Sequence, residues 1–125
     1  IRIPASREEG TRVELRSPDP SANPYLALAV CLAAGLEGIR SKIMPPKAVD
    51  KNVYEMPLDE TQAKGIESLP STLQEAVEEL KKDEFILKVL GEHISQNYIT
   101  AKQAEWASYT SQVTKWELEE YLYKI

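Results

Sequence analysis

The sequence is poor in cysteine, in clustered positive charge and in long apolar runs, and each shortage excludes a class of protein. Its one cysteine, Cys31, rules out an internal disulfide and a thiolate metal cluster. No run of Lys or Arg exceeds two residues and the net charge is −5, which argues against nucleic-acid binding. The longest apolar stretch, from Tyr25 to Leu36, is too short to span a membrane. Without a signal-peptide pattern either, the sequence predicts a cytoplasmic protein.

What the chain does contain is typical of a folded protein. Apolar residues make up 42% and charged residues 28% of its 125 residues, a balance that excludes disorder and suits one domain. The chain opens directly on a strand-like pattern at Ile1, without an initiator Met. We therefore expect residues 1–125 to be a fragment of a longer protein.

The first 16 residues have the pattern of a short antiparallel strand pair. Thr11, Val13 and Leu15 alternate with charged residues, as in a strand with two unlike faces. The stretch Arg7–Gly10 before them suits a turn. We predict an α+β fold, in which the strand pair of residues 1–16 belongs to a larger sheet of the parent protein and residues 23–125 are mainly helical.

The first predicted helix is unusually apolar. Asn23 can cap it and Pro24 suits its first position, where the missing N–H costs nothing. From Tyr25 to about Ile39 almost no polar face remains, which is typical of a helix buried on most sides. We expect this helix to need more protein around it than the rest of the chain provides.

The rest of the chain predicts shorter helices with recognisable end signals. They are a helix after a capping box of Ser71 and Gln74, one from Asp83 to Leu90 ended by Gly91, a longer one over about Glu92 to Val113, and a terminal one after a capping box of Thr114 and Glu117.

A row of charges on the second predicted strand is the strongest candidate for chemistry. Residues two apart on a strand point the same way, about 6.6 Å apart, so Arg12, Glu14 and Arg16 form a row of cation, anion and cation. Such a row can bind a polyanion through its arginines while the carboxylate holds a divalent metal, and Arg2 could join it. The alternative is an ordinary solvated strand face, and spacing alone favours that alternative.

An ordered series of motifs resembles the signature near the C-terminal end of the catalytic domain of bacterial type I glutamine synthetases. The motifs are RIP at 2–4, TRVELR at 11–16 and PDPSANPYL at 18–26, and shorter matches follow at 34–39, 50–54, 91–93 and 116–121. Together they cover nearly the whole chain. The resemblance therefore favours the functional interpretation of the charged row.

The resemblance implies an ATP-dependent ligase that forms glutamine from glutamate and ammonia through a γ-glutamyl phosphate. Members of the family use two divalent cations, Mg²⁺ or Mn²⁺, in a site at the junction of two subunits. The full-length enzyme is expected to be a cytoplasmic homododecamer of two rings, in which the C-terminal helix reaches into the opposing ring.

The resemblance also assigns roles to single residues. Arg2 resembles the catalytic arginine that contacts the transferring phosphoryl group, and Arg12 resembles a nucleotide-contacting arginine. Arg16 resembles the residue that binds the side-chain carboxylate of glutamate, and Glu14 resembles a ligand of the metal that bridges the nucleotide phosphates. Arg7 lies where relatives carry a basic residue near the adenine, although a simple turn role fits it equally well.

The resemblance leaves several points open. The fragment lacks the remaining metal ligands and the neighbouring subunit, so we expect it to be inactive alone. Exposed strand edges and the very apolar first helix should make it self-associate. A glutamine-synthetase-like γ-glutamyl ligase that uses another amine is one alternative, and a non-catalytic assembly or regulatory module is another. Tyr54 matches a tyrosine that is adenylylated in one subgroup of the family, but the shorter C-terminal part favours an unmodified residue.

Overall fold

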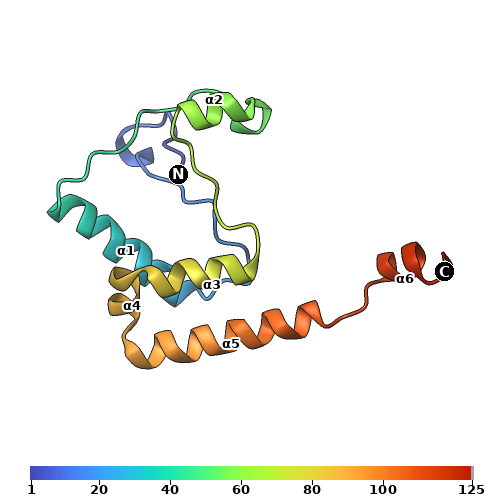
Figure 1. Ribbon diagram of the computed structural model, residues 1–125. Coiled ribbons are helices and arrows are strands. Elements are labelled where there is room, and N and C mark those ends of the chain that lie inside the picture. The colour runs from blue at the N-terminus through green and yellow to red at the C-terminus, as the bar shows by residue number, and fades with distance from the viewer. Residues whose placement is uncertain (125) are drawn as a thin grey trace. The chain divides into compact units, whose positions relative to one another are not determined.

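The computed structural model describes residues 1–124, apart from the side chain of Leu58, and is dominated by helices (Figure 1). The helices are α1 (Pro24–Arg40), α2 (Leu58–Ala63), α3 (Leu73–Lys82), α4 (Glu84–Leu90), α5 (Glu92–Thr110) and α6 (Lys115–Tyr121), with short 3-10 turns at Glu8–Gly10 and Val53–Glu55. The chain divides into two compact units, Ile1–Ile43 and Met44–Ile125.

The predicted strand pair is wrong, and with it the α+β fold class. Among the described residues, the first 16 contain a single antiparallel bridge, between Arg2 and Glu14, and no sheet. The bridge consists of two backbone hydrogen bonds, of 2.9 and 2.8 Å. A two-stranded ribbon is marginal in water without further strands or a packed face. Here the predicted inward face finds no cover, since Val13 is 70% exposed, and pairing stops after one residue on each side.

Helix α1 begins where the sequence predicts it. The Asn23 side chain accepts hydrogen bonds from the backbone N–H groups of Tyr25 and Leu26, at 3.0 and 3.3 Å, and Pro24 occupies the first turn. None of its residues is buried within this chain, and Leu28 is 71% exposed. The local signals thus predicted the helix correctly, but the burial expected from its composition is not provided by the described part of the chain.

Helix α3 begins one residue later than its predicted capping box. The N-cap is Thr72, whose hydroxyl accepts from the N–H of Glu75 at 3.1 Å, while the Glu75 carboxylate accepts from the N–H and the hydroxyl of Ser71 at 2.8 Å each. The predicted pair of Ser71 and Gln74 is therefore wrong. A carboxylate at the helix start accepts two hydrogen bonds and interacts favourably with the helix dipole, which an amide does less well.

Helices α3, α4 and α5 contact one another and enclose the small core of the second unit. Val77 of α3 is 4% exposed, and Ser95 of α5 is 5% exposed. The Ser95 hydroxyl donates to the carbonyl oxygens of Gly91 and Leu87, at 2.8 and 3.1 Å, so its polar group is satisfied. Ser95 therefore fastens α5 to the end of α4 without leaving a buried polar atom unpaired.

Gly91 forms the elbow between α4 and α5. Asp83 caps α4 by accepting from the N–H of Ile86 at 2.9 Å, and α4 ends at Leu90 with Gly91 as its C-cap, as the sequence predicts. The backbone of Gly91 has φ 77° and ψ 158°, a conformation that is essentially restricted to glycine. The turn from α4 into α5 therefore depends on the missing side chain at this position.

Replacing Gly91 with alanine should destabilise the helical unit by about 2 kcal/mol, because the new Cβ makes this backbone conformation strained. The matched control is Gly65→Ala, since Gly65 also has positive φ, of 63°, and has no neighbour within 4 Å of an added Cβ. It should cost about 1 kcal/mol, the usual penalty of the left-handed region. Urea unfolding followed by helical circular dichroism measures both. Equal losses would contradict a special role of Gly91.

The last two helices complete the second unit. Helix α5 ends at Thr110, three residues before the predicted end, because the side chains of Ser111 and Gln112 donate back to the carbonyl oxygen of Ser108. Helix α6 follows α5 after a short linker (Figure 1). It has the predicted capping box of Thr114 and Glu117, with both reciprocal bonds present. No described helix has the combined length and apolar character that a membrane crossing requires.

Candidate functional site

Three arginines share one carboxylate in the first unit. Arg2 and Arg16 donate to Oε2 of Glu14, at 3.2 and 2.9 Å, and Nε of Arg12 donates to Oε1 at 3.1 Å. We call these four residues the arginine cluster. Four of the five residues that the sequence singles out as a candidate site are therefore brought together by the structure.

Two local features of the backbone build the arginine cluster. The extended run from Thr11 to Arg16 places side chains two residues apart on the same side, so Arg12 and Arg16 flank Glu14. The single backbone bridge brings Arg2 beside Glu14 from twelve residues away. One bridge therefore gives the juxtaposition that the sequence analysis assigned to a strand pair.

The exposure of the arginine cluster suits an anion. The Glu14 side chain is 21% exposed, whereas those of Arg2, Arg12 and Arg16 are 57%, 52% and 68% exposed. Three guanidinium groups against one carboxylate leave a formal charge of +2, on side chains that are each more than half exposed. Guanidinium forks of this kind pair with phosphate or carboxylate oxygens.

The arginines also set the protonation of Glu14. The hydrogen bond from Arg16 is the largest effect and holds the pKa of the Glu14 carboxyl below its ordinary value of 4.5. Desolvation opposes it by raising the pKa, and Arg2 and Arg12 lower the pKa further. A carboxyl whose pKa is lower in the folded chain than in the unfolded chain stabilises the fold at pH values above the unfolded pKa. That contribution is lost as the pH falls through the lowered value, so the arginine cluster should stay intact at neutral pH and come apart in acid.

A ¹³C NMR titration of the Glu14 carboxyl carbon should show a midpoint below 4.5. The variant Arg16→Gln should raise that midpoint, because it removes the hydrogen bond that lowers the pKa most. The control Arg40→Gln removes the same charge from the exposed end of α1 and should leave the midpoint unchanged. A midpoint that does not respond to Arg16→Gln would contradict the shared carboxylate.

Arg7 does not join the arginine cluster. One of its terminal nitrogens, Nη1, donates to the backbone carbonyl oxygens of Pro4 and Ser6, at 2.9 and 3.0 Å. It is thus engaged with the turn that carries it, while its other donors remain available.

The described side chains can provide one ligand to a divalent metal, but not a complete metal site. Among residues 1–124, no group of three or more His, Cys, Asp or Glu side chains is placed to hold a metal ion. Glu14 offers a hard carboxylate, the ligand type that Mg²⁺ and Mn²⁺ prefer, but both of its oxygens accept from arginines. The positive charge around Glu14 disfavours a free cation and favours one that is already bound to an anion.

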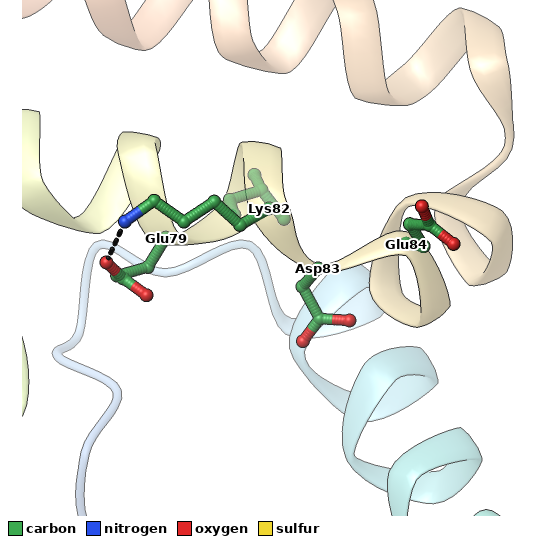
Figure 2. A pocket seen from close by; sticks show the side chains of 5 residues that line it. Glu79, Lys82, Asp83 and Glu84 are labelled. Atoms are coloured by element: carbon green, nitrogen blue, oxygen red, sulfur yellow. Dashed lines mark hydrogen bonds and ion pairs between the residues drawn. The ribbon is translucent and has the colours of Figure 1, made fainter.

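A surface hollow in the second unit has no comparable convergence of charged groups. It is lined by Glu79, Leu80, Lys82, Asp83 and Glu84, at the junction of α3 and α4 (Figure 2). Lys82 pairs with Glu79 at 2.7 Å, an ion pair that raises the pKa of the lysine. The carboxylates of Asp83 and Glu84 point away from that pair (Figure 2). The polar groups of the hollow therefore do not converge on a common ligand.

A second ion cluster was missed by the sequence analysis. Oε1 of Glu60 accepts from Lys64, four residues later on the same helical stretch, at 2.8 Å and from Lys51 at 2.9 Å. The hydrogen bonds from Lys64 and then Lys51 lower the pKa of Glu60 to about 2. The spacing of Glu60 and Lys64 is a recognisable signal, but the contact with Lys51 depends on the path of the loop. This cluster ties the loop to α2.

The arginine cluster presents guanidinium donors around one carboxylate, a combination whose chemistry suits an anion that carries a metal ion. Comparisons with known proteins place the chain in a family. Residues 1–121 match the family model described as glutamine synthetase, catalytic domain. The chain is 53% identical to the glutamine synthetase of Thermotoga maritima, over 98% of this chain and 28% of that protein. It is 52% identical to the glutamine synthetase of Thermus thermophilus, over 98% of this chain and 27% of that protein.

A solved structure is also similar to this chain. The structure of apo GmaS without ligand superposes with a TM-score of 0.74 at 41% identity, and covers 86% of this chain and 24% of that one. The chain belongs to the glutamine synthetase family and is the C-terminal part of its catalytic domain. It spans a little over a quarter of the length of the curated relatives that it matches.

Proposed function

We propose that this chain supplies part of the active site of an ATP-dependent ligase that makes glutamine from glutamate and ammonia. In this reaction the side-chain carboxylate of glutamate takes the γ-phosphoryl group of ATP, which releases ADP and gives γ-glutamyl phosphate. Ammonia then displaces phosphate. The observation that carries the proposal is the arginine cluster, because phosphoryl transfer is catalysed mainly by positioning and by cations that stabilise the transferring group.

Each member of the arginine cluster has a role that its chemistry supports. Arg2 would contact the transferring phosphoryl group as the catalytic residue, and Arg12 would bind the nucleotide phosphates. Arg16 would bind the side-chain carboxylate of glutamate, for which a guanidinium fork is suited. All three keep outward-facing donors, since each side chain is more than half exposed.

Glu14 would hold a divalent metal, Mg²⁺ or Mn²⁺, that arrives with the nucleotide. Such a metal neutralises charge on the phosphates during transfer. For Glu14 to bind it, the arginines must give up at least part of their hold on the carboxylate. Phosphate and carboxylate oxygens of the substrates offer them replacement partners, because they are acceptors of the same kind as Glu14.

Three further assignments belong to the proposal. Arg7 keeps donors that could reach the adenine side of the nucleotide, in addition to the bonds that Nη1 makes. Tyr54 lies fully exposed in the 3-10 turn at Val53–Glu55, and we propose that it is not modified. The full-length enzyme would be a cytoplasmic homododecamer, in which the other subunits and the rest of the catalytic domain provide the missing metal ligands.

The test compares the isolated chain with the full-length enzyme that carries it. The isolated chain should form no glutamine from glutamate, ammonia and ATP, whereas the full-length enzyme should do so only with Mg²⁺ or Mn²⁺. Amines such as polyamines, supplied in place of ammonia, test the alternative of a different γ-glutamyl ligase. A full-length protein that assembles but transfers γ-glutamyl groups to no amine would make this region a docking module and overturn the proposal.

A further inference from the structure

Arg7 closes the turn that precedes the arginine cluster. Its Nη1 donates to the carbonyl oxygens of Pro4, a buried residue, and Ser6. Its own carbonyl oxygen accepts from the N–H of Gly10 at 3.2 Å. The side chain and backbone of Arg7 thus hold both ends of the segment from Pro4 to Gly10, which we call the Arg7 loop.

The Arg7 loop is tight enough to need such a clamp. Glu8 has a φ of 58°, in the left-handed region that residues with a Cβ adopt at a cost. A Cβ added to Gly10 would lie 3.0 Å from Cβ of Ser6, which is tighter than most Cβ contacts in proteins, so one of the two residues would have to shift. Strained backbone persists only where surrounding contacts impose it, and the hydrogen bonds of Arg7 are such contacts.

The Arg7 loop reaches the arginine cluster through Gly10. The carbonyl oxygen of Gly10 accepts from Nη1 of Arg12 at 3.1 Å, while Nε of Arg12 donates to Glu14 at 3.1 Å. Two bonds from different atoms fix a planar guanidinium in both position and orientation. The orientation of Arg12 therefore depends on where the loop holds the carbonyl group of Gly10.

We propose that Arg7 is a positioning residue, whose clamp on the Arg7 loop orients the Arg12 guanidinium beside Glu14 before any nucleotide binds. Its consequence for nucleotide binding rests on the proposed function, but the orientation of Arg12 does not. Arg7 acts here through Gly10 and needs no contact with a ligand. An arginine that served only to touch the nucleotide would leave Arg12 unchanged in the ligand-free chain.

The first test measures solvent exchange of the Arg12 Nε–H by NMR in the ligand-free chain of 125 residues. Arg7→Gln should accelerate this exchange about fivefold, which corresponds to the loss of one ordinary hydrogen bond. Arg40→Gln is the control for the lost charge, because Arg40 lies exposed in the last turn of α1, and it should leave exchange unchanged. Equal exchange in Arg7→Gln and the parent chain would overturn the proposal.

The second test uses a substitution at Gly10 that displaces the backbone of the Arg7 loop without changing any charge. Gly10→Ala forces its Cβ against Ser6 and should accelerate exchange of the Arg12 Nε–H as Arg7→Gln does. The double variant Ser6→Gly with Gly10→Ala removes both atoms that the new Cβ would meet, and should restore slow exchange. Rescue supports positioning through the Arg7 loop. Slow exchange in both Gly10→Ala and Arg7→Gln would show that Arg12 does not depend on the Arg7 loop and would overturn the proposal.

Calorimetric binding of Mg·ATP to the same variants separates this inference from the proposed function. Weaker binding in Arg7→Gln, with unchanged exchange at Arg12 in the ligand-free chain, would identify a direct nucleotide contact and overturn positioning. Faster exchange at Arg12 supports positioning whether or not the chain binds Mg·ATP. An absence of Mg·ATP binding in the parent chain and in the full-length enzyme would count against the proposed function alone.

Discussion

Replacing Glu14 with glutamine in the full-length enzyme should reduce kcat/KM for glutamine formation by about a hundredfold or more, while assembly is retained. Glutamine keeps the shape of the side chain but loses the charge that a hard divalent metal requires. Losing even a residue that only supports a metal ligand costs about 10–100-fold, so the loss of a ligand should cost at least as much. The substitution also leaves three guanidinium groups without their shared carboxylate.

Activity as a function of Mg²⁺ and Mn²⁺ concentration is the measurement that checks this, with light scattering to confirm assembly. Glu67→Gln provides the matched control, since Glu67 is an exposed acid of the second unit, outside the arginine cluster. It should retain full activity. Unaltered metal dependence in Glu14→Gln would remove Glu14 from the metal site, and loss of assembly would assign it a structural role instead.

The charged row of the arginine cluster could be predicted because it follows from local geometry. In any extended segment, Arg12, Glu14 and Arg16 lie on one side, whether or not a sheet forms. The convergence of all three arginines on one carboxylate could not be predicted, since it depends on the bridge from Arg2. The strand pair failed for a related reason. Alternation shows which faces a strand would have, but not whether other strands are present to stabilise it.

Helix ends were predictable to the extent that their capping partners are close in sequence. Asn23, Asp83 and Thr114 cap the helices that the sequence assigns to them. The choice between neighbouring candidates was not predictable, as the shift from Ser71 to Thr72 shows. Burial was the least predictable property. The apolar residues of α1 predict a buried helix, but a buried helix needs covering protein, and none of its residues is buried in this chain.

Replacing Arg2 with glutamine in the full-length enzyme should lower kcat by about a thousandfold and change KM for ATP much less. An arginine that stabilises charge on a transferring phosphoryl group is worth about 10³–10⁵ in kcat, because the charge it meets is greatest in the transition state. The geometry suits this role. The backbone of Arg2 is fixed by two hydrogen bonds to Glu14, and its side chain uses one nitrogen, Nη1, for the carboxylate. Its other donors are left for the substrate.

Steady-state kinetics with varied ATP and glutamate separate kcat from KM, and Arg40→Gln controls for the lost charge. Arg2→Lys should recover only part of the rate, since an ammonium keeps the charge but not the planar fork that meets two oxygens at once. A rise in KM with kcat unchanged would mean that Arg2 binds ground state and transition state equally. Arg2 would then be a binding residue, and the stabilisation of the transferring group would have to come from elsewhere in the enzyme.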